Sequence, residues 1–185
     1  MHSKLDRKIY SDQTDKFPIT WFCVNKYIMF LFDLNINNIL SEPTRNRTSG
    51  KMMILYQKLI DQLKEKVILK KLHLLNNECS EEFKEVIKNN GMKYQLVPPH
   101  EKPIQVFKDN FLLVLVKIDK NFPLQLWCQI LIHKDHQLNL LRKSRAVPTI
   151  SAFAHMYGQH DYNTHPFAPL GCEVKIHVML SGLKT

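Results

Sequence analysis

Residues 19–40 read ITWFCVNKYIMFLFDLNINNIL, and this stretch decides the fold class. It holds two short apolar runs, 19–22 and 27–32, which are rich in aromatic and β-branched side chains and are separated by polar residues. Such runs are typical of β-strands. From Met52 to Val67 the pattern changes, because apolar residues recur at steps of three and four opposite a row of lysines. We therefore expect an amphipathic helix to follow the strands.

Strand and helix signals alternate in the rest of the chain. The apolar run 72–75 precedes Ser80, a preferred N-cap residue, and two acids that suit the first turn of a helix. Asn90-Gly91 is a helix stop, and 94–97 is typical of a strand that ends at prolines. Helical spacing returns at 104–118 and again after Pro123. This order predicts an α/β domain, a mixed five-stranded sheet flanked by helices as in the ribonuclease-H-like fold.

Composition and charge restrict the class of protein. The 185 residues suffice for one core without disulfides, and the four cysteines form no Cys-x-x-Cys pair that would indicate a zinc cage. Without a signal peptide or an apolar run of membrane-spanning length, the chain is expected in the nucleus or cytoplasm and not in a membrane. The net charge of +9 favours polyanionic partners, of which nucleic acid is the commonest.

We expect the chain to divide into three parts. Residues 1–9 are expected to form a disordered tail, and residues 10–145 the domain itself. Residues 146–185 are expected to form a truncated, irregular extension, because prolines and one glycine lie among its aromatic and histidine residues. A further β segment is predicted to begin within this extension, at 174–179.

Short strings of sequence occur along nearly the whole chain, from Tyr10 to His177, in one shared order. They are SDQT (11–14), NKYI (25–28), EP (42–43), NRT (46–48), LNNECS (75–80), GMKYQLVPPH (91–100), FKD (107–109), FPLQLW (122–127) and APLGC (168–172). Each string alone is weak evidence, but together the chain resembles the integrase catalytic core of long-terminal-repeat retrotransposons, in a degenerate copy. The resemblance implies a ribonuclease-H-like fold and, by descent, DNA strand transfer.

The resemblance also implies a metal site. In that family three carboxylates hold two Mg²⁺ or Mn²⁺ ions, which clamp the attacking and leaving oxygens of a phosphodiester. The first carboxylate corresponds to Asp12, the second to Asn76 and the third to Glu101. Because an amide stands at position 76, one anionic ligand is lost from the set. We expect this copy to be catalytically inactive and its metal binding to be impaired.

The third position has two interpretations. The family's segment between Pro-Pro-His and its glutamate is missing here, which removes about two turns of chain before Glu101. In one interpretation Glu101 is the family's glutamate, displaced to a position before the helix because Pro103 restricts the residue that precedes it. In the other, the deletion removed that glutamate and Glu101 is a loop acid. Both predict a distorted fold near residues 98–106.

Basic side chains offer a candidate surface for DNA. They are Arg45, Arg47, Lys64, Lys70, Lys71, Arg142, Lys143 and Arg145. Such contacts would be made to phosphates and would weaken steeply with salt; a solvated helix face explains the lysines equally well. No small-molecule substrate is expected, and homodimerisation stays open. The rival hypotheses are a surviving metal enzyme, a DNA- or protein-binding module that needs no metal, and a decaying reading frame without a selected role.

Overall fold

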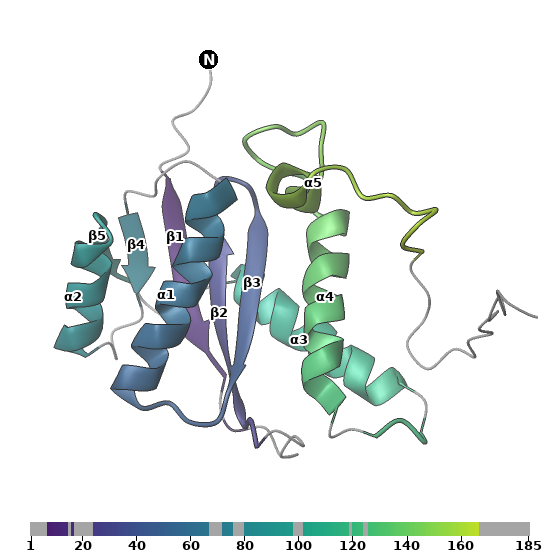
Figure 1. Ribbon diagram of the computed structural model, residues 1–185, viewed down its shortest axis with the longest axis horizontal. Helices are drawn as coiled ribbons and strands as arrows, with labels where there is room; N and C mark the ends of the chain where they lie inside the picture. Colours follow the sequence, from purple (N-terminus) through teal and green to yellow (C-terminus); the bar gives the residue numbers. More distant parts are fainter. Residues whose placement is uncertain are drawn as a thin grey trace, which may run out of the picture.

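A computed structural model describes residues 7–14, 16, 24–66, 72–75, 80–97, 102–118, 120–123 and 126–166. Within them it confirms the strands predicted at 27–32, 72–75 and 94–97 and the helices predicted between and after them. Figure 1 shows the arrangement of its helices and strands. The elements are β1 (Lys8–Gln13), β2 (Tyr27–Asp33), β3 (Asn38–Thr44), α1 (Ser49–Lys66), β4 (Leu72–Leu75), α2 (Glu81–Asn89), β5 (Lys93–Leu96), α3 (Lys102–Lys117), α4 (Trp127–Leu141) and α5 (Ala152–Tyr157).

The strands form one mixed sheet in the order β3-β2-β1-β4-β5. β2 runs antiparallel to both of its neighbours, β1 and β3, whereas β4 runs parallel to β1 and β5 parallel to β4. The predicted five-stranded α/β sheet is thus confirmed, and its order and strand directions are consistent with the ribonuclease-H-like architecture.

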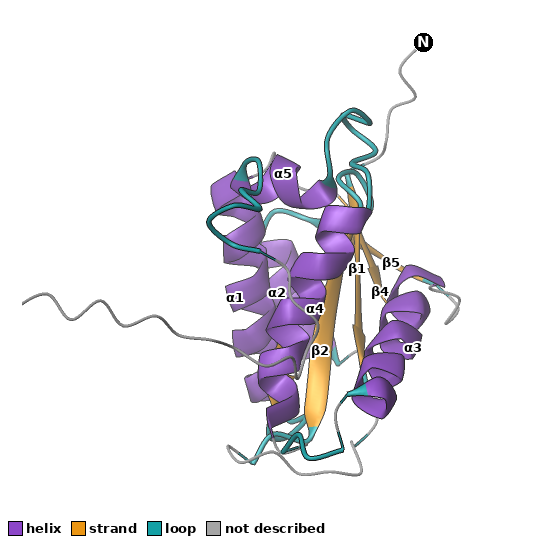
Figure 2. Ribbon diagram, turned by 90° about the vertical axis from the view of Figure 1, so that its right-hand side faces the viewer, coloured by secondary structure: helices purple, strands orange, loops and turns teal. Residues whose placement is uncertain are grey.

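Helices cover both faces of the sheet. Successive side chains of β2 point to opposite faces and therefore join two different cores. Met29 and Leu31 join the core that contains buried residues of α1 and α2. Ile28, Phe30 and Phe32 join the core that contains residues of α3 and α4. Figure 2 shows the sheet nearly on edge, with α1 and α3 on opposite sides of it.

Local capping predicted from the sequence is confirmed for α2. The Ser80 hydroxyl accepts a hydrogen bond from the Phe83 backbone N–H at 3.3 Å. Gly91 ends this segment with φ of +75°, a conformation that glycine adopts without strain. Both signals depend only on neighbouring residues, so they can be recognised in sequence.

Helix α4 closes the outer edge of β3. The Asn139 side chain imitates a neighbouring strand, because its Oδ1 accepts from the Ile39 N–H at 2.9 Å and its Nδ2 donates to the Ile39 carbonyl at 2.7 Å. One turn earlier, Asp135 Oδ2 accepts from the Ser41 N–H at 3.0 Å. Pro43, the next residue on this side, has no N–H to offer. The edge therefore presents no free N–H at these three positions for edge-to-edge association.

Two regular elements extend into segments that were expected to lack regular structure. β1 begins at Lys8, inside the segment expected to be a disordered tail, because fully buried Ile9 pairs with both β2 and β4. The extension expected to be irregular contains α5, which Ser151 caps and whose Met156 joins the core beside α1.

Three further expectations concern segments that lie partly or wholly outside the described residues. Residues 102–106 are the regular start of α3, so the distortion expected there is absent from these residues, while 98–101 lie outside the described residues. The apolar run 19–22 and the β segment expected at 174–179 also lie outside them. Among the described helices, none combines the length and hydrophobicity that crossing a membrane requires.

Candidate functional site

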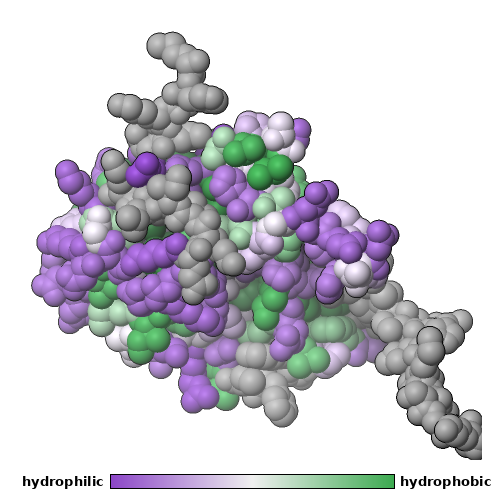
Figure 3. Space-filling model, turned by 45° about the horizontal axis from the view of Figure 1, so that its top comes forward, coloured by the Kyte–Doolittle hydropathy of each residue, from purple (hydrophilic) through white to green (hydrophobic). Residues whose placement is uncertain are grey.

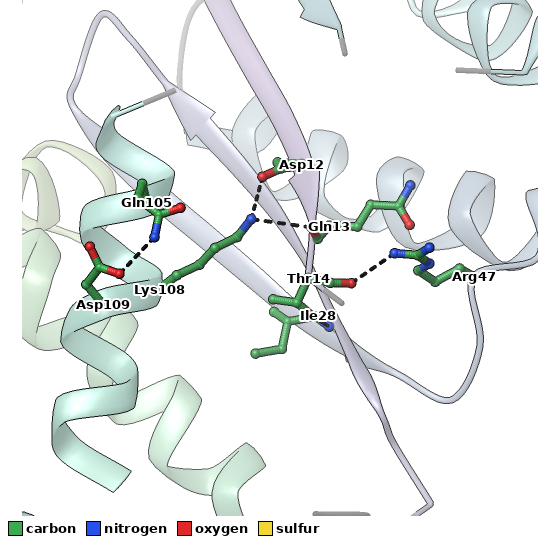
Figure 4. A network of polar contacts seen from close by, with 8 residues as sticks. All are labelled: Asp12, Gln13, Thr14, Ile28, Arg47, Gln105, Lys108 and Asp109. Carbon is green, nitrogen blue, oxygen red and sulfur yellow. Dashed lines mark hydrogen bonds and ion pairs between the residues drawn. The ribbon is translucent and has the colours of Figure 1, made fainter. Parts of the chain in front are cut away.

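Asp12 lies near the end of β1, the central strand of the sheet, and its side chain points to the face that α3 covers. Its Oδ2 accepts a hydrogen bond from Lys108 Nζ at 2.6 Å, an ion pair between β1 and α3. The same ammonium lies 3.4 Å from the Gln13 carbonyl oxygen (Figure 4). The Asp12 side chain is 30% exposed and the Lys108 side chain is 23% exposed. The carboxylate at the first predicted metal position is thus neutralised by the protein itself.

Packing of α3 against the sheet positions Lys108. Phe107 and Phe111, on the inner side of α3, are buried, and the Phe107 ring meets the Phe30 ring edge-on with centroids 4.8 Å apart. The Lys108 ammonium lies 6.0 Å from the centre of the Phe30 ring. Because aromatic packing anchors the helix on both sides of Lys108, the lysine is held toward the end of β1.

A buried polar network holds β1 against β4 and α1 beside this site. His73, on β4, lies between the Tyr56 hydroxyl, 2.8 Å from Nδ1, and the Ser11 hydroxyl, 2.9 Å from Nε2. The Tyr56 ring also stacks on the imidazole. Burial lowers the pKa of His73 to about 3, so the ring is neutral and one of its nitrogens donates while the other accepts. This network helps to hold β1 and β4 together next to Asp12.

Asn76 and Glu101, the other two predicted ligands, lie outside the described residues. In the sequence Asn76 directly follows β4 and Glu101 directly precedes α3. β4 is hydrogen-bonded to β1, and α3 reaches Asp12 through Lys108. Within the described part of the chain, no group of three His, Cys, Asp or Glu side chains could hold a metal ion. The assignment of the three ligands stays a prediction.

Arg47 lies at the same end of β1 as Lys108. Its Nη1 donates to the Thr14 carbonyl at 3.2 Å, and its guanidinium lies 5.4 Å from the centre of the Tyr27 ring. Thr14 is itself fixed, because its hydroxyl accepts from the Ile28 N–H at 2.9 Å. Arg45, two residues earlier, is exposed. The end of β1 thus has Lys108 on its α3 face, paired with Asp12, and Arg47 over the Tyr27 ring.

The other predicted nucleic-acid contacts are dispersed. Arg142 and Arg145 approach the Phe32 ring at 5.7 and 6.0 Å, at the end of β2 opposite to Tyr27, and Lys143 between them is exposed. Burial lowers the pKa of Arg142, with a smaller contribution from neighbouring Arg145.

Lys64 belongs to a different surface, since its Nζ lies 2.5 Å from Asn90 Oδ1 beside α2. Figure 3 shows a mostly hydrophilic surface over the side of the molecule where α2 lies. Lys70 and Lys71 lie outside the described residues. Among the predicted basic residues that are described, Arg47 therefore lies at the end of β1 that carries Asp12, over the Tyr27 side chain on the α1 face of the sheet, and no described basic residue of the predicted set contacts Asp12.

Lys108 is the residue that sequence reasoning missed. Its signal was present, since Lys108 stands inside the FKD string at 107–109 and directly follows a residue predicted to face the core. A lysine beside a buried helix stripe is common, however, and only the packing of α3 shows that it faces Asp12.

Comparisons with known proteins show the fold alone. No family model matches the chain, and no curated relative does. Among solved structures, the chain is similar to one in the cryo-EM structure of the simian T-cell lymphotropic virus intasome in complex with PP2A regulatory subunit B56 gamma. The TM-score is 0.57 at 12% sequence identity, and the match covers 97% of this chain and 67% of that chain. The sheet and helices described above thus have a counterpart in a retroviral intasome.

Proposed function

We propose that this chain is an integrase-like domain of retroelement descent that binds nucleic acid through phosphate contacts and does not catalyse strand transfer. The observation that carries the proposal is the ion pair between Asp12 and Lys108, at the position that the resemblance assigns to the first metal ligand. The intasome-like fold supports the descent, and the cationic groups around the end of β1 support the polyanionic ligand.

The ion pair opposes metal binding for an electrostatic reason. A divalent cation needs the negative charge of the carboxylate, but the Lys108 ammonium at 2.6 Å already neutralises it. Metal binding would have to displace the ammonium and leave it close to a dication. An amide at position 76 cannot supply the missing negative charge. Two Mg²⁺ or Mn²⁺ ions would therefore meet a site with too few free anionic ligands.

Phosphate binding needs no metal, because lysine and arginine contact phosphate oxygens directly. Arg47 lies at the end of β1, exposed Arg45 precedes it by two residues in the chain, and the chain carries a net charge of +9. We expect affinity to fall steeply with salt and to depend little on base sequence, since phosphate contacts carry no direct sequence information.

Thermal unfolding with and without Mn²⁺ tests the metal part of the proposal. A ligand that binds the folded state raises the melting temperature by mass action. We expect no Mn²⁺-dependent rise in the wild-type chain beyond that of an Asp12→Ala, Glu101→Ala double variant. A rise that the double variant loses, together with Mn²⁺-dependent nicking of supercoiled DNA that Asp12→Ala abolishes, would overturn it. Absence of a cooperative transition would indicate a decaying relic instead.

Salt dependence of DNA binding tests the surface. Replacing Arg45 and Arg47 by Gln should reduce the slope of log affinity against log salt by about 2, since each phosphate contact contributes about 0.9. The matched control is the double variant Lys88→Gln, Lys93→Gln, which removes the same charge from exposed positions on α2 and β5. Equal losses in the two variants would show that net charge, and not this surface, drives the binding.

A further inference from the structure

The outer face of α3 is apolar and exposed. Val106 is 45% exposed, Leu112 49%, Leu113 54% and Val116 81%. These side chains lie on the side of the helix opposite to buried Phe107 and Phe111, and in Figure 2 no described element covers that side of α3. Large apolar residues clustered on one helix are unusual on the surface of a protein that acts alone, and they mark interaction sites.

The exposed residues follow the helical repeat. Leu113 is seven residues after Val106, and Val116 is three residues after Leu113, so the three side chains form one stripe along α3. Exposed Asp109 and Lys117 lie along the same stripe, Asp109 toward its N-terminal end and Lys117 in the last turn of the helix. The Asp109 carboxylate is oriented by Gln105, whose Nε2 donates to it at 2.8 Å. We call these five residues the α3 stripe.

We propose that the α3 stripe packs against the α3 stripe of a second copy of this chain, with the two helices antiparallel. Charge decides the orientation. In the antiparallel pair Asp109 of each copy lies toward the Lys117 end of the other helix, whereas a parallel pair would bring like charges together at both ends. Leu113, near the middle of the stripe, then packs close to the two-fold axis, as a self-complementary interface requires.

The proposed dimer is independent of the proposed nucleic-acid function. Lys108 points from the opposite side of α3 to Asp12, so pairing of the α3 stripes leaves the ion pair at the end of β1 uncovered. One helix face gives a small interface, below the roughly 1,200 Å² typical of stable complexes, so the association is of the weak class and requires concentrated protein to detect.

Sedimentation equilibrium of the full chain over a range of concentrations tests the proposal. We expect a monomer–dimer equilibrium that Leu113→Ser or Val116→Ser weakens by at least about tenfold, since each change removes apolar area from the interface. The matched control is Ile54→Ser on α1, which removes a side chain that is 63% exposed and lies outside the α3 stripe. Monomeric wild-type protein at every concentration, or equal weakening by the control, would overturn the proposal.

Charge reversal tests the orientation. Asp109→Lys alone and Lys117→Asp alone should each weaken the homodimer, because like charges then meet at both ends of the interface. The double variant should recover it, and a mixture of the two single variants should form a heterodimer. Single variants that weaken the dimer without recovery in the double variant would overturn the antiparallel arrangement. Circular dichroism of each variant checks that these exposed changes leave the fold intact.

Discussion

Acid should destabilise this domain through His73, beginning as the pH falls below 6.5. The imidazole is buried between Tyr56 and Ser11, and its pKa is lowered from 6.5 to about 3. The unfolded chain therefore binds a proton at this residue more tightly than the folded chain does. The stability that neutral His73 contributes is complete above pH 6.5 and is lost as the pH falls toward 3.

The size of the effect follows from the shift. Each pH unit within this window corresponds to about 1.4 kcal/mol, so the whole shift amounts to about 5 kcal/mol. Between pH 7 and pH 5, only the interval from pH 6.5 to pH 5 lies within this window, so the free energy of unfolding should fall by about 2 kcal/mol. For a domain of this size that loss corresponds to a fall in melting temperature of roughly 4–8 °C.

Urea unfolding of the wild-type chain and of a His73→Gln variant at pH 7 and pH 5 measures this loss. The variant should be less stable at pH 7 because it lacks the buried imidazole. Because the glutamine amide is neutral at both pH values, the free energy of unfolding of the variant should fall by about 2 kcal/mol less on acidification. His133 and His136, whose pKa values desolvation also lowers, contribute equally to both proteins. Parallel stability profiles for the two proteins would refute the assignment of the acid sensitivity to His73.

Three other predictions concern the site, the sheet edge and a helix cap. A double-mutant cycle of Asp12→Asn and Lys108→Met should show a coupling energy of about 1–2 kcal/mol in urea unfolding, because the two side chains are only partly exposed and the pair is intermediate between surface and buried ion pairs. A coupling energy near zero would mean that the ion pair does not stabilise the fold. Asp135→Asn should raise the melting temperature at pH 7, and this gain should shrink toward pH 4. The reason is that burial raises the pKa of Asp135 and opposes its ionisation despite the hydrogen bonds from Ser41. A gain in melting temperature that is the same at both pH values would contradict this cause. Ser80→Ala should lower the free energy of unfolding by about 1 kcal/mol through loss of the α2 cap, and unchanged stability would show that backbone or solvent groups replace it.

Much of the fold could be predicted because its signals are local. The change from strand pattern to helical spacing after β3, the Ser80 cap and the Gly91 stop all depend on residues within one or two turns of each other. The exceptions lie at the ends of the domain. Residue Ile9 stands in a polar neighbourhood with little pattern of its own, and it joins the sheet because β2 and β4 provide hydrogen-bonding partners on both sides.

The candidate site was predictable only in part. Asp12 could be singled out from its surrounding strings, and the structure places it with Arg47 at the same end of the central strand. Arg142 and Arg145 had the same charge signal in sequence, yet they lie at the opposite end of β2. A basic residue in a sequence shows its charge, but the strand order decides which basic residues become neighbours.

The sequence by itself indicated the strands and helices of the middle of the chain, its basic character and the presence of an amide at position 76. Tertiary structure alone decided that Lys108 neutralises Asp12, 96 residues away, and that Asn139 covers the edge of β3 at Ile39, 100 residues away. The physical reason is the range of the interactions. Hydrophobic periodicity and capping act between near neighbours, whereas an ion pair forms only after the sheet has brought β1 and α3 together.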